Sequence, residues 1–130
     1  MADRTDGNLT DPTYRAHRDT ATGNARAAID NALASESLDA IVTPTQLPAP
    51  ALGFRGGGPK FASSTRASAM AGYPMITVPA GYAREELPLG LTFLGTRHDD
   101  AKLIAYAYAY EQATNIRKLP SYLPSLPSAP

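Results

Sequence analysis

The sequence contains no cysteine and no tryptophan in its 130 residues. The lack of cysteine excludes disulfides and thiolate metal sites. No charge of one sign prevails either, because 12 Lys and Arg residues balance 12 Asp and Glu residues. Since no basic face is visible in the sequence, we expect no nucleic-acid partner. A neutral chain also lacks the charge repulsion that opposes association with other chains.

Long hydrophobic runs are missing as well. Every apolar stretch is interrupted by Pro, Gly or Arg, well short of the ~20 residues that a membrane-spanning helix needs. The first residues, MADRTDGNLTDP, lack the apolar core of a signal peptide. We therefore expect a cytoplasmic protein without a membrane partner. The hydrophobic content of 43% and the charged content of 18% are typical of a globular chain.

Composition divides the chain into three parts. Residues 1–10 are polar and predict a flexible leader, and residues 121–130 continue a proline-rich tail. Residues 11–120 form a single segment whose patterns alternate between helix and strand. We therefore predict one α/β unit, a fragment of a mixed β-sheet flanked by helices.

Local signals place the elements within this unit. Asp11 followed by Pro12 predicts a helix start, and the helical spacing of apolar residues ends near Ser35. Gly23 either bends this helix or marks where its packing begins. Further along we predict strands at 39–43, 75–78 and 89–94, a long loop at 44–60, a weak helix at 62–71, an exposed hairpin connection at 80–88, and a last helix capped by Asp99 or Asp100.

The predicted sheet has too few helices to cover it. In the third strand, Leu89, Leu91 and Phe93 share one face, and the last helix offers a stripe that includes Leu103 and Ala107. The other face of that strand carries Gly90, Thr92 and Leu94. Leaving one apolar sheet face in water would forfeit on the order of 5 kcal/mol. We infer that the chain associates with another chain or belongs to a larger sheet.

Two stretches carry a family resemblance. One is LDAIVTPT followed by PAPALG, and the other is AGYPMITVPAGY, then LPLGLTFLGTR and AKLIAYAYAYEQAT. In this order and spacing, residues 26–120 resemble the closing, C-terminal segment of the amidase signature family. The resemblance implies a large mixed sheet with flanking helices. It also implies hydrolysis or transfer at an amide carbonyl, with a Ser nucleophile, a second Ser and a Lys base.

The Gly/Ser-rich segment and preceding Lys that carry this chemistry in the family have no match here. We therefore assign no catalytic residue, no cofactor and no metal to the chain. The leading hypothesis is a C-terminal portion or subunit of an amide hydrolase, with a missing N-terminal portion as partner and a small amide as substrate once complemented. The alternative is a non-catalytic module that self-associates as a homo-oligomer.

Several look-alike motifs have simpler explanations. GGGPKFASS places Lys60 close to Ser63 and Ser64, but the family's Lys comes far ahead of its serines, so we interpret these as loop residues. The same stretch fails the phosphate-loop pattern, because Pro59 interrupts Gly-Lys-Ser/Thr. His98 with its two following aspartates is better explained by helix capping than by metal binding.

The best candidate binding residues follow or precede strands. In open α/β sheets ligands lie beyond the carboxyl ends of strands. This rule selects Thr45, Gln46 and Leu47 after the first strand as substrate-binding candidates. Weaker candidates are Gly72, Tyr73 and Pro74, which come before the second strand. The competing explanation for both groups is simple punctuation of the strands.

Overall fold

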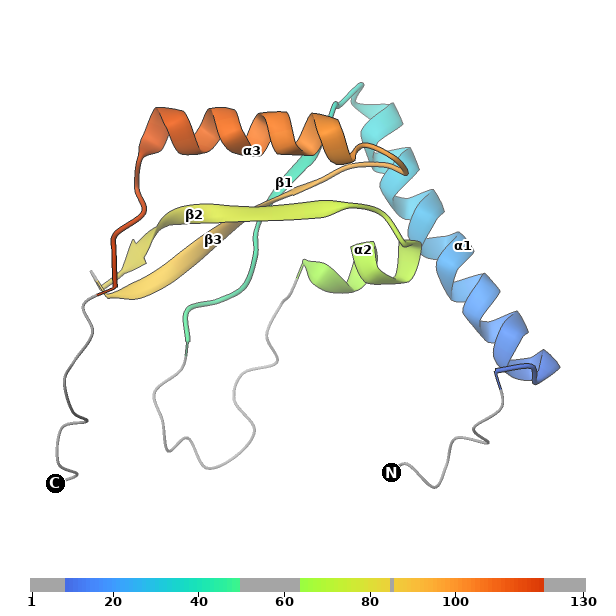
Figure 1. The fold of residues 1–130 in the computed structure, drawn as a ribbon. Coiled ribbons are helices and arrows are strands. Elements are labelled where there is room, and N and C mark those ends of the chain that lie inside the picture. Colours follow the sequence, from blue (N-terminus) through green and yellow to red (C-terminus); the bar gives the residue numbers. More distant parts are fainter. Residues whose placement is uncertain (1–8, 50–63, 85, 121–130) are drawn as a thin grey trace, which may run out of the picture.

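The structure, a computed structural model, describes residues 9–49, 64–84 and 86–120 (Figure 1). Three helices and three strands follow one another as α1 (Pro12–Ser35), β1 (Ile41–Pro44), α2 (Thr65–Ala71), β2 (Met75–Ala83), β3 (Leu87–Leu94) and α3 (Asp100–Thr114). Most of the predicted leader, 1–10, and all of the predicted tail, 121–130, lie outside the described residues.

Helix α1 begins and ends where the sequence predicts. The Asp11 carboxylate accepts a hydrogen bond of 2.8 Å from the backbone N–H of Tyr14, and Pro12 occupies the first turn. The helix continues through Gly23 without a break. Its packing starts after that glycine, where Ile29 and Leu33 are buried. Of the two alternatives for Gly23, the start of packing is therefore confirmed.

The three strands form one sheet in the order β1-β3-β2, and both pairs are antiparallel. Ile41 and Met75 both lie opposite Leu94, whereas Pro44 and Val78 both lie opposite Leu91. Strands β1 and β2 therefore run in the same direction on either side of β3. The predicted α/β fragment is confirmed, although these three strands contain no directly paired parallel neighbours.

Strand β2 is longer than predicted, and the exposed connection predicted at 80–88 is wrong. The strand continues to Ala83, and β3 begins at Leu87. A bulge between Pro79, opposite Gly90, and Gly81, opposite Leu89, absorbs one extra residue. Because β2 is an edge strand of this sheet, the proline is tolerated there and the pairing resumes beyond it.

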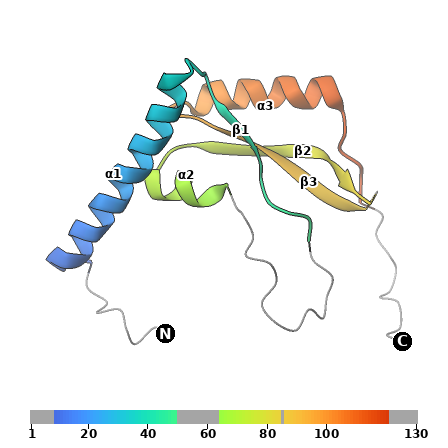
Figure 2. The same ribbon diagram turned by 180° about the vertical axis from the view of Figure 1, so that it is seen from behind.

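The helices cover the two sheet faces unequally. Helix α3 lies along one face of the β2–β3 hairpin, whereas α2 lies on the opposite side and α1 stands beside one end of the hairpin (Figures 1 and 2). Phe93 and Val78 pack with Leu103 and Ala107 of α3, as the predicted helix stripe requires. Leu94 instead packs with α1 and α2 through Ile29, Leu33 and Ala71. This cluster around Leu94 covers only one end of the sheet face on which Leu94 lies.

Several apolar side chains remain exposed. Val42 of β1 is 52% exposed, although its consecutive apolar neighbours suggest a strand covered on both faces. It pairs with Phe93, on the side of the sheet where α3 packs against β2 and β3. On α3 itself, Ile104 and Tyr108 are 58% and 63% exposed on the surface turned away from the core. The prediction that β1 is covered on both faces is therefore wrong for this chain alone.

Candidate functional site

Three threonine hydroxyls meet on the part of the sheet face that α1 and α2 leave uncovered. The Oγ1 atom of Thr92, on β3, lies 2.7 Å from Oγ1 of Thr45 and 2.9 Å from Oγ1 of Thr77. The Thr45 and Thr77 oxygens are 3.4 Å apart. Thr92 is fully buried, whereas Thr77 is exposed. The cluster therefore links β1, β3 and β2 and presents hydroxyls to the surface.

The cluster forms because the backbone register brings these residues to one face. Thr77 lies directly opposite Thr92. Thr45 follows β1 and extends its pairing, since its N–H donates a 2.8 Å hydrogen bond to the carbonyl of Gly90. A Cβ atom on Gly90 would lie 2.6 Å from Thr45 Oγ1 and 2.8 Å from Thr77 Cγ2. The absence of a side chain at position 90 is thus what lets the three threonines approach.

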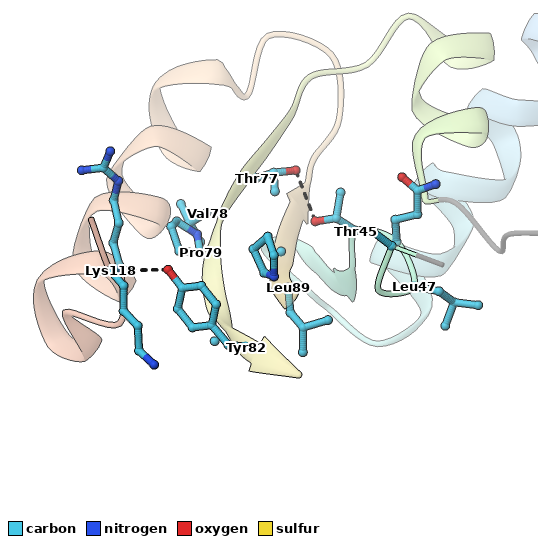
Figure 3. A pocket seen from close by; sticks show the side chains of 14 residues that line it. Thr45, Leu47, Thr77, Val78, Pro79, Tyr82, Leu89 and Lys118 are labelled. Carbon is cyan, nitrogen blue, oxygen red and sulfur yellow. Dashed lines mark hydrogen bonds between the residues drawn. The ribbon is translucent and has the colours of Figure 1, made fainter. Parts of the chain in front are cut away.

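A pocket of about 700 Å³ opens over this face (Figure 3). Thr45 and Thr77 lie on its sheet side, Leu89 and Tyr82 come from the far end of the β2–β3 hairpin, and Leu47 stands on the opposite side. The described residues that line it are Thr45, Gln46, Leu47, Ala49, Thr77, Val78, Pro79, Gly81, Tyr82, Pro88, Leu89, Gly90, Arg117 and Lys118. The pocket therefore combines a hydroxyl floor with apolar walls and a basic rim.

The basic rim comes from the segment after α3, which runs back to the far end of the hairpin (Figure 1). The Lys118 backbone N–H donates a 2.9 Å hydrogen bond to the Tyr82 hydroxyl. The Lys118 Nζ atom lies 4.8 Å from the centre of the Tyr82 ring, within the range of a cation–π contact. These two contacts hold the segment, with Arg117, against β2.

The three stronger sequence candidates all line this pocket. Thr45 contributes to the hydroxyl cluster, and Gln46 and Leu47 extend the wall beyond β1. Leu47 is 53% exposed, so its apolar side chain is available for contact. The structure brings these residues together with β2, β3 and the segment after α3. Their role in substrate binding stays a prediction.

The weaker candidates lie at the other end of the sheet, before β2 begins. Gly72 ends α2 in a left-handed conformation, with φ of 68°. The Tyr73 hydroxyl donates a 2.8 Å hydrogen bond to Asp30, and this bond, with burial and the Asp30 charge, raises the tyrosine pKa. Tyr73 thereby joins the start of β2 to α1. For Gly72, Tyr73 and Pro74, too, substrate binding stays a prediction.

The sequence analysis missed residues of both the pocket and the threonine cluster beneath it. Thr77 and Thr92 were not singled out, although the alternation of β3 places Gly90 and Thr92 on one face and so contained the signal. Arg117 and Lys118 gave no signal of their own, because their position depends on the chain reversal after α3 and on the contact with Tyr82.

The threonine cluster supplies the pocket with hydrogen-bonding groups. The hydrogen bonds of the Thr45, Thr77 and Thr92 hydroxyls within the described residues join these groups to one another. A hydroxyl needs a base within hydrogen-bond reach to become a nucleophile. Unassisted hydroxyls can instead donate and accept hydrogen bonds to a bound polar group.

The look-alike motifs do not form a site in the described part of the chain. Lys60 and Ser63 lie outside the described residues, and Ser64 donates a 3.3 Å hydrogen bond to the carbonyl of Thr45. His98 has a positive φ of 69° at the turn before α3. Within the ranges that the structure describes, no three His, Asp or Glu side chains gather to hold a metal ion.

Asp99 is the residue before α3, as predicted. Its carboxylate makes no capping hydrogen bond to the helix, however, and contacts Thr96 and Lys102 instead. Its Oδ2 atom accepts hydrogen bonds of 2.9 Å from the N–H and the hydroxyl of Thr96. Lys102 forms an ion pair with the same oxygen, also at 2.9 Å. The Lys102 contact, followed by the bond from the Thr96 backbone, lowers the pKa of Asp99. The pair fixes the turn that enters α3.

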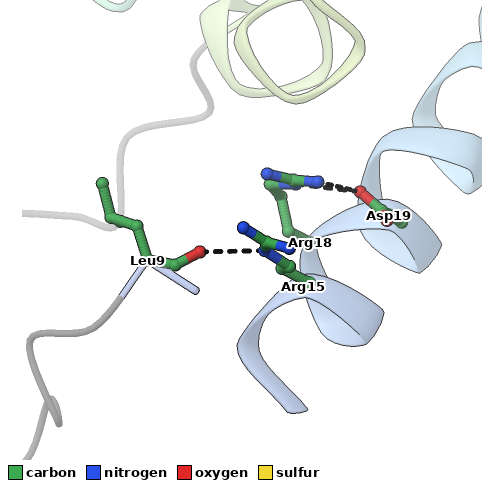
Figure 4. A network of polar contacts seen from close by, with 4 residues as sticks. All are labelled: Leu9, Arg15, Arg18 and Asp19. Carbon is green, nitrogen blue, oxygen red and sulfur yellow. Dashed lines mark hydrogen bonds and ion pairs between the residues drawn. The ribbon is translucent and has the colours of Figure 1, made fainter. Parts of the chain in front are cut away.

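The polar network at the start of α1 is local and exposed (Figure 4). Arg18 pairs with its neighbour Asp19 at 2.6 Å, and Arg15 donates a 3.2 Å hydrogen bond to the Leu9 carbonyl. Exposed pairs of this kind contribute little to stability.

No helix in the described ranges is long and apolar enough to cross a membrane.

Comparison with known proteins identifies the class. The model of the amidase family matches residues 2–104 of this chain. The chain therefore belongs to the amidase family, the family whose signature the sequence resembles. Its α/β fold is that of a portion of an amidase-family enzyme.

Individual relatives agree with this assignment. The structure of native peptide amidase from Stenotrophomonas maltophilia is 45% identical, with a TM-score of 0.75 over 90% of this chain and 23% of that one. An amidase family protein from Bacillus anthracis is 28% identical, with a TM-score of 0.71 over 89% of this chain and 20% of that one. A glutamyl-tRNA(Gln) amidotransferase subunit from Thermodesulfovibrio yellowstonii is 39% identical over 66% of this chain and 19% of its own length. The chain thus spans only about a fifth of the length of these relatives.

Proposed function

We propose that this chain forms the C-terminal wall of the substrate cleft in an enzyme that hydrolyses amide bonds. The observation that carries the proposal is the pocket of about 700 Å³ on a sheet face that the chain's own helices leave uncovered. The match to peptide amidase over 90% of the chain supports it, because the matched segment is 23% of a larger enzyme.

In this proposal the chain binds and orients a small amide substrate, and another portion of polypeptide supplies the reacting groups. Thr45, Gln46 and Leu47 border the substrate, with the hydroxyl cluster beneath them. The family resemblance implies that the serine nucleophile, the second serine and the lysine base come from the missing N-terminal portion. We place the assembled enzyme in the cytoplasm and include no cofactor.

Complementation tests the proposal directly. The segment of the Stenotrophomonas maltophilia peptide amidase that matches this chain is deleted, and the remaining portion is coexpressed with this chain. We expect the two polypeptides to copurify and to release ammonia from a primary amide. The truncated peptide amidase expressed alone is the control, and it should be inactive. A folded complex without amide hydrolysis would contradict the proposed function.

The rival function is a module that self-associates without activity. It is favoured by the two edge strands, β1 and β2, and by the exposed Ile104 and Tyr108 of α3. It predicts a stable homo-oligomer that does not exchange protomers with the truncated peptide amidase. Copurification of a mixed complex would exclude this function, whereas a homo-oligomer that persists during coexpression would support it.

A further inference from the structure

The pocket over the threonine cluster carries a positive charge that the chain as a whole does not. Basic and acidic residues are equal in number in the sequence, 12 of each. Among the described residues that line the pocket, however, Arg117 and Lys118 are basic and none is acidic. A concave surface lined by charge of one sign concentrates ligands of the opposite sign. The pocket is therefore suited to a ligand with a negative group.

Neither cation forms an ion pair with a residue that the structure describes. Lys118 is fixed by its backbone hydrogen bond to Tyr82 and by its ammonium group over the Tyr82 ring. The ion pairs within the described residues lie elsewhere, at Arg18–Asp19 and at Asp99–Lys102. The Arg117 guanidinium and the Lys118 ammonium thus keep donors for an incoming anion.

The other residues of the pocket determine which further features a ligand needs besides a negative charge. Leu47, Pro79 and Leu89 provide apolar surface beside the rim, and the threonine cluster provides hydroxyls on the floor. An amide with a short apolar body could place its polar amide group near the hydroxyls and its anionic end at the rim. A planar carboxylate suits the fork of an Arg side chain. The lining includes no residue from the first turn of a helix, the usual source of backbone N–H groups for a phosphate.

We propose that the pocket selects amide substrates that carry a carboxylate, and that Arg117 and Lys118 bind this carboxylate. This inference rests on the proposed function, since it names the substrate class of the same cleft. Arg117 and Lys118 determine specificity and take no part in bond breaking. The amide group itself lies toward Thr45 and Thr77, on the side that the catalytic portion would complete.

A matched pair of probes tests the substrate class in the purified chain. Succinamic acid carries a carboxylate and one primary amide, and 4-oxopentanamide carries the same primary amide with a neutral methyl ketone in place of the carboxylate. Each is titrated into isotopically labelled chain at low salt, and NMR shifts of Thr77, Tyr82 and Gly90 report binding. We expect the carboxylate probe to bind about fivefold or more tightly than the neutral one. The preference should shrink as salt is added, because both cations are solvent-exposed.

Charge-removing variants identify the groups responsible. In the double variant Arg117→Gln and Lys118→Gln, the two probes should bind equally. The double variant Arg15→Gln and Arg18→Gln removes the same charge from the far end of α1 and should keep the preference. Amide spectra confirm that both variants are folded. Equal binding of the two probes to the unaltered chain, or a preference that survives the Arg117/Lys118 substitutions, would overturn the proposal.

The complemented enzyme separates this inference from the proposed function. Both probes contain an amide that the assembled enzyme could hydrolyse, and their relative kcat/KM values report the selection. A higher kcat/KM for the carboxylate probe, lost in the Arg117/Lys118 variant, supports the inference. Hydrolysis without such a preference overturns the substrate class while the proposed function stands. Loss of all hydrolysis in a folded complex overturns the proposed function instead, and the binding preference of the isolated chain then decides whether the site takes carboxylates.

Discussion

At the scale of single residues, Gly90 and Thr92 determine the shape of the candidate site. Both lie on the same face of β3, and the arrangement of Thr45 and Thr77 depends on both of them. Gly90 leaves space for Thr45 and Thr77, and the buried Thr92 hydroxyl connects those two side chains across the sheet. The pocket floor is therefore built by a missing side chain at one position and a hydroxyl at the other.

Replacement of the glycine tests the first property. In Gly90→Ala the new methyl group would meet Thr45 Oγ1 at 2.6 Å and Thr77 Cγ2 at 2.8 Å, so one or both threonines must shift. We expect a loss of about 1–3 kcal/mol in the free energy of unfolding. Gly23→Ala is the matched control, because its Cβ meets nothing within 4 Å. That change in the exposed part of α1 should stabilise the chain by about 0.5–1 kcal/mol. Urea denaturation of the two variants gives both values, and a neutral Gly90→Ala would contradict the close packing.

Replacement of the buried threonine tests the second property. Thr92→Val keeps the shape of the side chain but removes the hydroxyl that contacts Thr45 and Thr77. We expect a cost of about 1–2 kcal/mol in the free energy of unfolding. Thr77→Val should cost less, because Thr77 is exposed and water can replace its contact. Thermal unfolding followed by circular dichroism measures the order, and an equal or reversed cost would argue against Thr92 as the centre of the cluster.

Sequence reasoning reached part of this site. The rule that ligands lie beyond strand ends selected Thr45, because the end of β1 is marked by Pro44 in the sequence itself. It could not select Arg117, since the segment after α3 reaches the pocket through a contact with Tyr82 that only the folded chain contains. Residues next to a strand can thus be predicted locally, whereas residues brought by a chain reversal cannot.

At the scale of elements, the start of α3 depends on an electrostatic turn. The Asp99 carboxylate binds Thr96 and Lys102 together, and these contacts lower its pKa. Contact with Asp99 in turn raises the pKa of Lys102. A carboxyl with a depressed pKa in the folded chain adds stability above its unfolded pKa and loses it as the pH falls through the folded value. The raised Lys102 pKa adds stability that is lost only as the pH rises through the folded value of the lysine.

This turn gives a prediction with a defined pH dependence. Asp99→Asn should lower the Tm by a few degrees at pH 7, because the ion pair with Lys102 is lost. The difference in Tm between this variant and the unaltered chain should narrow below pH ~4, where the aspartate of the unfolded chain becomes protonated. It should vanish once the Asp99 carboxyl of the folded chain is protonated too. Asp100→Asn, one residue on and exposed, is the control and should change the Tm less. A difference that stays constant from pH 7 to pH 2 would show that the carboxylate charge is not the cause.

The element boundaries show where local signals mislead. The helix α1 was predicted well because Asp11, Pro12 and the spacing of its apolar residues agree with one another. Strand β2 was predicted too short because Pro79 and Gly81 look like strand breakers. They are tolerated because β2 is an edge strand and a bulge restores the pairing. Whether a proline ends a strand depends on the strand's neighbours, which the local sequence does not contain.

At the scale of the whole molecule, the exposed apolar surfaces point to a further layer. Helix α3 buries Leu103 and Ala107 against the sheet, yet Ile104 and Tyr108 form a second apolar strip on its outer side. A helix that is apolar on two sides is typical of an element buried between layers. The relatives, of which this chain spans about a fifth, have the additional polypeptide that such a layer requires.

Substitution on this strip separates stability from association. Ile104→Asp should lower the free energy of unfolding of the isolated chain by about 1 kcal/mol or less, because the side chain is already 58% exposed. In the complex with the truncated peptide amidase the same aspartate would be buried without a partner, so complex formation should fail or weaken severely. Thr13→Asp, in the exposed first turn of α1, adds the same charge as a control and should leave assembly unchanged. Light scattering after gel filtration gives the mass of each mixture. If Ile104→Asp assembles as well as the unaltered chain, the outer strip of α3 faces solvent in the complex, and the missing layer must lie on the threonine face or along the strand edges.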